Sequence, residues 1–95
     1  VVCGETLWMG GNENPYWQQD CAAATQNLLL AVEALGLGAV WTGVYPNQDL
    51  YPKLHNYLNL PSTVQPFCCI PVGHPAGNEQ PKDKWKPENI HYGKW

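Results

Sequence analysis

The sequence predicts an α+β fold in which helices and strands are layered as an α/β sandwich. A long helical pattern lies between two short apolar segments, and a second, weaker helical pattern is followed by another apolar segment, so strands and helices alternate as βαβαβ. At 95 residues, of which 44% are hydrophobic, the chain is limited to one domain. We expect residues 1–73 to form the βαβαβ core and residues 74–95 to form an extended tail.

The first strand is expected at residues 1–4, where Val1 and Val2 are followed by the apolar Cys3. A loop rich in turn-forming residues follows, from Met9 to Pro15. Because the sequence starts with Val and inside a strand pattern, we expect a carboxy-terminal portion of a longer protein. These residues carry no secretion signal, and we take the protein to be cytoplasmic.

The next element expected is a long helix with an unusual lack of charge. Between Asp20 and Glu33 the only ionisable side chain is that of Cys21, so this helix lacks a charged solvent face and must be covered on most sides. The cover can come from a larger core or from a second subunit, and the segment is too short and too polar to cross a bilayer. Gly36 is expected to close the helix as a left-handed cap. One helical face is predicted from residues that recur at steps of three and four, namely Trp17, Cys21, Ala24, Leu28, Ala31, Val32 and Leu35.

The remaining elements complete the βαβαβ order. Residues 38–42 are apolar and β-branched at Val40, which suits a buried strand entered from a tight turn. A loop over residues 43–48 leads to a second helix over residues 49–60. The last strand is expected over residues 66–73, with its prolines at the ends or at an edge position.

Charge and cysteine usage argue against several classes of function. The formal net charge is −3, with five lysines and no arginine, so the chain lacks the basic field that nucleic acid requires. The four cysteines form no C-x-x-C pair and have no histidine at a metal-ligand spacing. Cys68 and Cys69 are adjacent on a strand and are interpreted as small apolar residues on its two faces rather than as a disulfide framework. We therefore expect no metal, no nucleic acid and no membrane partner.

Trp41, Thr42 and Gly43 stand where a strand gives way to a loop, a place where ligands bind in open α/β sheets. Trp41 offers an aromatic plane, Thr42 a hydroxyl and Gly43 a backbone amide with no side chain in the way, which suits a flat ligand. On residue chemistry alone, a buried tryptophan beside a turn glycine is the simpler explanation of the same residues. The histidines and carboxylates show no spacing typical of a catalytic triad or an acid–base pair, so no catalytic residue is assigned.

Five motifs in a fixed order cover nearly all of the chain. They are Tyr16-Trp-Gln-Gln-Asp20, Ala23-x-x-Gln26-Asn27-Leu28-Leu29, Ala34-Leu-Gly-Leu-Gly-Ala-Val-Trp-Thr-Gly43, Ile70-Pro-Val-Gly-His-Pro75 and Ile90-His-Tyr-Gly-Lys-Trp95. As a set they resemble the carboxy-terminal half of the FMN-dependent nitroreductase family. The resemblance implies a nitroreductase-like FMN-binding fold, with residues 1–95 as the carboxy-terminal portion of a single domain. It also implies a homodimer with flavin mononucleotide in a cleft at the dimer interface.

The same resemblance suggests which residues bind the cofactor. Trp41, Thr42 and Gly43 match the positions that meet the flavin ring in this family, with a backbone amide near the flavin N5 atom. Lys94 matches a basic residue near the end of the chain that approaches the phosphate or the ribityl chain. The Arg-x-Ser-x-Arg type segment that holds much of the phosphate in the family is absent, so this chain resembles about half of a flavin site.

The resemblance further implies an FMN-dependent NAD(P)H oxidoreductase that passes hydride through flavin N5 to electron-poor small molecules such as nitroaromatics or quinones. We expect a full-length parent to be the enzyme and the isolated chain to be inactive. Two other interpretations stay open, a non-catalytic dimerisation module and one subunit of a split flavoprotein. In the tail, Trp85, Tyr92 and Trp95 have no core of their own, so we expect them to pack against a surface, with a partner subunit as a candidate.

Overall fold

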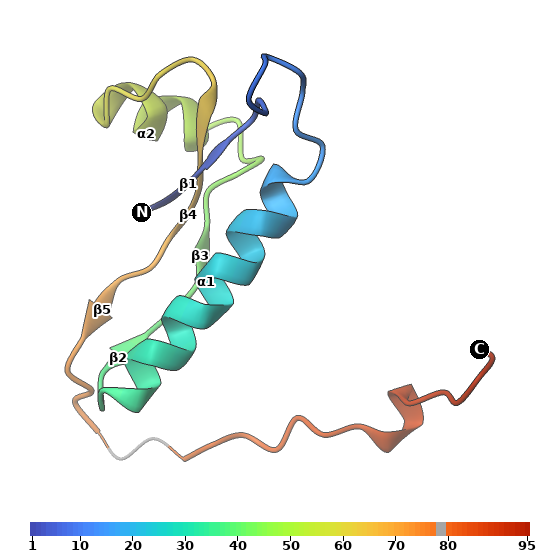
Figure 1. Cartoon of the computed structure of the whole chain (residues 1–95). Helices are drawn as coiled ribbons and strands as arrows, with labels where there is room; N and C mark the ends of the chain where they lie inside the picture. Colours follow the sequence, from blue (N-terminus) through green and yellow to red (C-terminus); the bar gives the residue numbers. More distant parts are fainter. Residues whose placement is uncertain (78–79) are drawn as a thin grey trace.

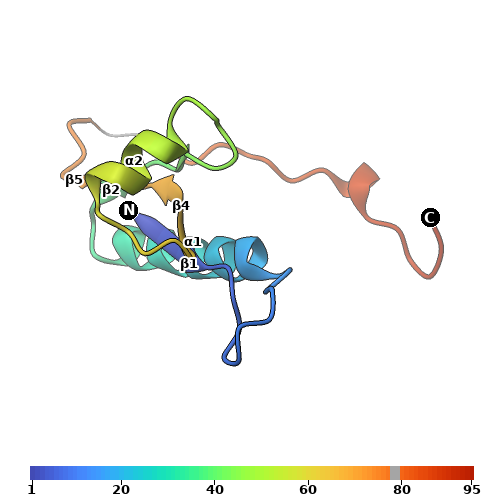
Figure 2. The same cartoon turned by 90° about the horizontal axis from the view of Figure 1, so that it is seen from above.

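The computed structural model describes residues 1–77 and 80–95. Along the chain the elements are β1 (Val2–Glu5), α1 (Trp17–Ala34), β2 (Gly38–Ala39), β3 (Thr42–Gly43), α2 (Tyr51–Tyr57), β4 (Val64–Cys69), β5 (Val72–Gly73) and the short 3-10 helix η1 (Pro87–Asn89). This is the expected βαβαβ order with two of its strands divided. Helices α1 and α2 lie on opposite sides of the strands, which gives the predicted sandwich of layers (Figure 1, Figure 2).

Both sheets pair their strands in the antiparallel direction. The larger sheet has the order β1-β4-β3, and the smaller sheet consists of β2 and β5. Pro66 lies within β4, the central strand, and faces Cys3 where the register of the β1–β4 pair shifts. The expectation of prolines only at strand ends or edges was therefore wrong for Pro66, because this irregularity in the ladder accommodates a residue that has no N–H to donate.

Residues 38–42 do not form the single buried strand that the sequence predicted. They divide into β2 and β3, which belong to different sheets. Ala39 pairs with Val72 and Thr42 pairs with Cys69, so the two ladders share one register. In that register Pro71 stands opposite Val40, in the gap between the two ladders. Pro71 cannot donate to the ladder, which explains the interruption. Ala39 of β2 and both residues of β3 are exposed.

The start and end of α1 follow from local sequence. The Asn14 side chain accepts a hydrogen bond from the Tyr16 N–H at 3.0 Å and donates to the Glu5 carbonyl, which ties the preceding loop to β1. At the other end Gly36 has a φ of 70°, as predicted for a left-handed cap. The N–H of Gly36 donates to the Glu33 carbonyl and that of Leu37 to the Val32 carbonyl, which is the Schellman arrangement.

The buried face of α1 differs in part from the predicted one. Trp17, Cys21 and Val32 are buried as expected, but the fourth buried residue is Thr25. Its hydroxyl donates to the Cys21 carbonyl at 2.7 Å and lies 3.5 Å from the Cys68 sulfur, so burying this polar group leaves it satisfied. Ala24, Leu28, Ala31 and Leu35, expected on the same face, are exposed, with Leu35 at 75%. Within this chain α1 is thus covered along one stripe only.

An aromatic cluster fixes α1 against the strands. The Trp17 ring meets the edge of Tyr45, with centroids 4.8 Å apart, and the edge of Phe67 at 6.0 Å. Tyr45 follows β3 closely and Phe67 lies in β4. These contacts set the position of the end of β3 relative to the start of α1.

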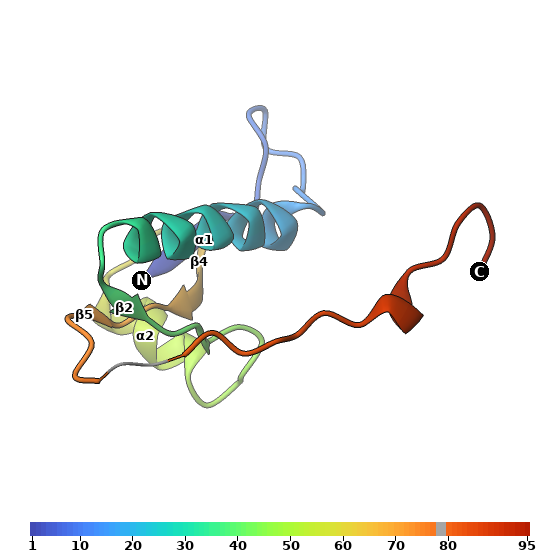
Figure 3. The ribbon, with the colours of Figure 1, turned by 90° about the horizontal axis from the view of Figure 1, so that it is seen from below.

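The tail runs away from the rest of the molecule in all three overall views (Figure 1, Figure 2, Figure 3). Its described residues are exposed, with Trp95 at 98%. Asn78 and Glu79 of the predicted tail lie outside the described residues. Within the part of the chain that the structure describes, no helix has the length and apolar character needed to cross a membrane.

Candidate functional site

The site predicted at Thr42 and Gly43 lies on the free edge of the larger sheet. Gly43 faces Cys68 of β4, and the next residue, Val44, donates its N–H to the Phe67 carbonyl at 3.1 Å. Because successive N–H groups of a strand point to opposite sides, the N–H of Gly43 points away from β4. Among residues 1–77 and 80–95, no strand lies on that side of β3. The edge therefore presents a backbone donor toward open space.

Gly43 also lacks neighbours on the side where a side chain would stand. A β-carbon built on this residue would meet no heavy atom within 4 Å outside its immediate chain neighbours. A planar group can approach the Gly43 backbone closely, because neither a side chain nor a packed neighbour stands in the way. Open space next to an outward N–H is the geometry that a ring with a hydrogen-bond acceptor at its edge requires.

A groove runs from this edge to helix α2. It has a volume of about 500 Å³ and is lined by Thr42, Gly43, Val44, Leu50, Lys53, Leu54, Tyr57 and Cys69. The lining is mostly apolar, with one charged residue, Lys53. The sequence pattern predicts α2 only as a packing helix, although Lys53 is distinctive as the only lysine that precedes the tail.

Trp41 stands beside this groove without lining it. Its ring meets Phe67 edge-on, with centroids 5.8 Å apart, and the residue is 38% exposed. Trp41 is therefore not the buried tryptophan that was the alternative to a ligand site, and its ring is not fully exposed either. One edge is held by Phe67 while the rest of the ring can meet a ligand.

Lys94 is not brought near these residues within one chain. It is exposed and stands next to the last residue of the chain, and the carboxy terminus lies away from the helices and strands in the overall views (Figure 1, Figure 3). Three other lysines, at 82, 84 and 86, lie earlier in the tail and alternate with Asp83 and Trp85. The assignment of Lys94 to a phosphate remains a prediction, and it requires the tail to reach a site on another chain.

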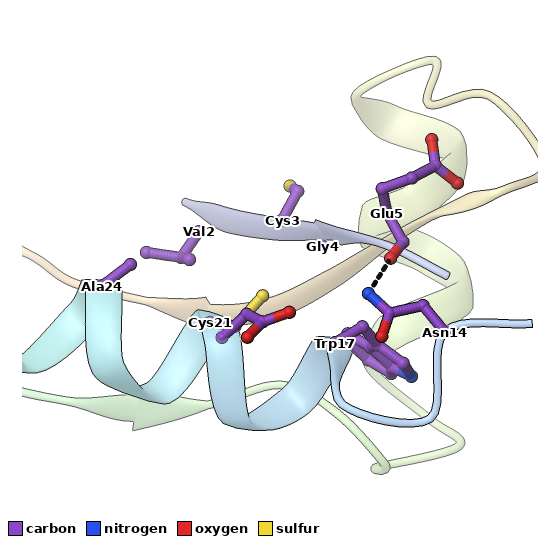
Figure 4. A pocket seen from close by; sticks show the side chains of 9 residues that line it. Val2, Cys3, Gly4, Glu5, Asn14, Trp17, Cys21 and Ala24 are labelled. Carbon is purple, nitrogen blue, oxygen red and sulfur yellow. Dashed lines mark hydrogen bonds between the residues drawn. The ribbon is translucent and has the colours of Figure 1, made fainter. Parts of the chain in front are cut away.

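A second hollow of about 290 Å³ lies along β1 and the first turns of α1, and its residues are drawn in Figure 4. Gly4 packs directly on Cys21 and Trp17, and the Asn14 side chain closes one end through its bond to the Glu5 carbonyl. Burial raises the pKa of the Cys21 thiol, with smaller contributions from Cys68 and Asp20, and burial also raises the pKa of Cys3. These thiols are protonated at neutral pH, and the hollow carries no activated nucleophile.

The other side chains that could act in catalysis or metal binding make structural contacts or stand apart from one another. His55 Nε2 lies 3.1 Å from the Pro61 carbonyl, and His91 stacks on Trp95 with centroids 4.1 Å apart. In residues 1–77 and 80–95, no cluster of three or more histidine, cysteine or carboxylate side chains is placed to hold a metal ion. We assign no acid–base residue to the site.

Comparison with known proteins adds to this geometry. The model of the nitroreductase family matches residues 9–74, from the loop before α1 to the residue after β5. A curated protein of Methanothermobacter thermautotrophicus, described as "Putative NADH dehydrogenase/NAD(P)H nitroreductase", is 49% identical over 80 residues, which are 84% of this chain and 42% of that protein. The "FMN reductase (NADPH)" of Bacillus subtilis is 32% identical over 73 residues, which are 77% of this chain and 28% of that protein.

A solved structure from Parabacteroides distasonis, with the same description as the Methanothermobacter protein, is 45% identical and superimposes with a TM-score of 0.88. The match covers 98% of this chain and 53% of that one. The chain thus spans about half the length of this structure and of the Methanothermobacter relative. The match over residues 9–74, the identities and the shared α+β fold agree. This chain belongs to the nitroreductase family.

Proposed function

We propose that the chain contributes one part of the flavin site of an FMN-dependent NAD(P)H oxidoreductase, which reduces electron-poor acceptors such as nitroaromatics or quinones. The observation that carries this proposal is the N–H of Gly43, which points outward from a sheet edge where a side chain would meet nothing. The name of the Bacillus relative, an FMN reductase that uses NADPH, supports the choice of cofactor and donor.

When bound, FMN would accept hydride from NAD(P)H at N5 and return it to an acceptor. The chain's own task is to position the ring. The Gly43 N–H would donate a hydrogen bond to the edge of the flavin ring, Thr42 would supply a hydroxyl at the same edge, and Trp41 would limit the space beside the ring. No side chain has to move a proton for these tasks, which fits a site without an activated acid or base.

The phosphate of FMN is the part that this chain holds least well. The chain has no arginine, and Lys82, Lys84, Lys86 and Lys94 all lie in the exposed tail. A phosphate favours the fork of a guanidinium, whereas lysine contributes only a point charge. We therefore expect the isolated chain to bind FMN weakly, and Lys94 to contribute once the tail lies on a partner.

The proposal includes a homodimer. Helix α1 carries no charge between Asp20 and Glu33, yet only one stripe of it is covered in this chain. A second copy, together with the tail, offers the missing cover. The four free cysteines support a reducing compartment, and we place the protein in the cytoplasm.

The test is a titration of the 95-residue chain with FMN, followed by amide NMR and flavin fluorescence. We expect shifts centred on the Thr42 and Gly43 amides and an affinity weaker than micromolar. Gly43→Val should remove these shifts, because its side chain occupies the space of the ring edge. Gly73→Val is the matched control, since Gly73 is also a glycine in a two-residue strand with nothing within 4 Å of its β-carbon position.

Two results would count against the proposal. One is an unshifted Gly43 amide at saturating FMN, and the other is a Gly43→Val chain that binds FMN as the wild type does. Dimerisation without any flavin response would favour the dimerisation module instead. Tight binding by the isolated chain would contradict the expectation that this chain holds only part of the site.

A further inference from the structure

The groove between β3 and α2 contains the only lysine of the folded body. Residues 1–77 hold five carboxylates, at Glu5, Glu13, Asp20, Glu33 and Asp49, but a single lysine, Lys53, and no arginine. A small anion that approaches this acidic body therefore meets one cationic side chain, and that side chain stands at a groove.

Nothing in the lining of the groove neutralises this charge. None of the five carboxylates lines it, including Asp49, which precedes Lys53 by four residues. Asp49 belongs to the turn before α2, where its N–H bonds to the Asn47 side chain. The positive charge of Lys53 is thus available to a ligand in the groove.

The walls of the groove suit an aromatic ring. Val44, Leu50 and Leu54 are aliphatic, and Tyr57, which is 85% exposed, contributes an aromatic ring at the rim. The volume of about 500 Å³ is within the range of small-molecule sites. Apolar walls with a single cation recognise a flat apolar body that carries one negative group.

We propose that this groove binds flat aromatic acceptors that carry a carboxylate, and that Lys53 determines this preference. The identification of the ligand as an electron acceptor rests on the proposed function, because Thr42 and Gly43, where the flavin edge is proposed to lie, line the groove. The contact between groove and ligand itself needs no flavin and can be measured without it.

The experiment compares para-nitrobenzoate with its neutral isostere para-nitrobenzamide, by amide NMR titration of the 95-residue chain. We expect both to shift the amides of Gly43, Leu54 and Tyr57, with the carboxylate binding about two- to fivefold more tightly, as an exposed ion pair allows. The preference should disappear in Lys53→Met, which keeps a long apolar side chain. It should persist in Lys84→Met, which removes a tail lysine, and should shrink in high salt.

Equal binding of the two ligands by the wild type, or shifts that map elsewhere, would overturn the proposal. So would groove shifts that appear with rising protein concentration alone, because a second copy would then occupy the groove. If nicotinamide mononucleotide bound more tightly than para-nitrobenzoate at the same amides, Lys53 would be assigned to binding of the electron donor NAD(P)H instead of the acceptor. A parallel FMN titration separates this inference from the proposed function. FMN shifts without a carboxylate preference contradict only the groove assignment, and the reverse result contradicts only the flavin site.

Discussion

Gly4 of β1 lies against Cys21 of α1 so closely that a β-carbon on Gly4 would stand 2.6 Å from the Cys21 sulfur. The same atom would lie 2.7 Å from the Trp17 ring. Only glycine lets the strand approach the helix to this distance, so this contact sets the spacing between the sheet and α1.

Gly4→Ala should therefore lower the free energy of unfolding by about 1–3 kcal/mol, because the added methyl group forces strand and helix apart. Urea unfolding measures the loss. Gly73→Ala serves as the control, since its β-carbon position is open, and its stability should be unchanged or slightly raised. Equal unfolding midpoints for Gly4→Ala and the wild type would show that the helix can move away at no cost.

Thr25→Val should cost about 0.5–1.5 kcal/mol of stability although the side chain keeps its shape. The hydroxyl bonds the Cys21 carbonyl and contacts the Cys68 sulfur in a fully buried position, and valine can do neither. Thr42→Val, at an exposed position, is the comparison and should leave the unfolding midpoint in place. A stabilised Thr25→Val variant would mean that burying the hydroxyl costs more than its bonds return.

Stability should fall at alkaline pH in a way that depends on Cys21. Burial raises the pKa of this thiol in the folded chain above its ordinary value of 9.0. As pH rises past that value, the unfolded chain loses the proton first, so the free energy of unfolding is constant below it and declines above it.

Unfolding curves at a series of pH values test this expectation. Cys21→Ala should show a shallower alkaline decline than the wild type. Cys21 should also be slow to react with iodoacetamide in the folded chain. Fast alkylation of Cys21 at neutral pH, or an unchanged slope in Cys21→Ala, would contradict the assignment.

Removal of the tail after residue 77 should change the unfolding free energy of the monomer by no more than about 0.5 kcal/mol relative to the untruncated chain, because the described tail residues are exposed. Self-association should weaken instead, and Trp85→Ala combined with Trp95→Ala should reproduce that effect, since two exposed tryptophans gain by burial on a partner. Sedimentation over a dilution series gives the dimer constants. Trp8→Ala removes an exposed tryptophan from a different part of the molecule and is the control. Identical constants for the double variant and the wild type would remove the tail from the interface.

Local sequence predicted the features that depend on near neighbours. The helical period placed α1, and the left-handed Gly36 ended it, because both need only residues within a few positions. The burial of Thr25 was missed, since its partner Cys68 lies 43 residues away. The division of the strand at residues 38–42 was missed for the same reason, because it depends on Pro71 standing opposite Val40.

The candidate site also has features that local sequence predicts and features that depend on distant parts of the chain. Thr42 and Gly43 could be singled out from composition at the end of a strand, and both line the groove. The outward direction of the Gly43 N–H could not be predicted, because it depends on which side β4 occupies. Lys53 was missed since only the packing of α2 over the sheet turns a surface lysine into part of a groove.

The interruption at Pro71 also separates the hydrogen-bonded ladder of the larger sheet from that of the β2–β5 pair. Among the described residues, no backbone hydrogen bond joins the two strands between the Ala39–Val72 pair and the Thr42–Cys69 pair. The strands are therefore carried across this gap by the chain itself and not by the ladder. Trp41 lies in the gap, next to the edge of the sheet that presents Gly43. Its backbone is held by no ladder bond, and its ring is positioned by the contact with Phe67 instead.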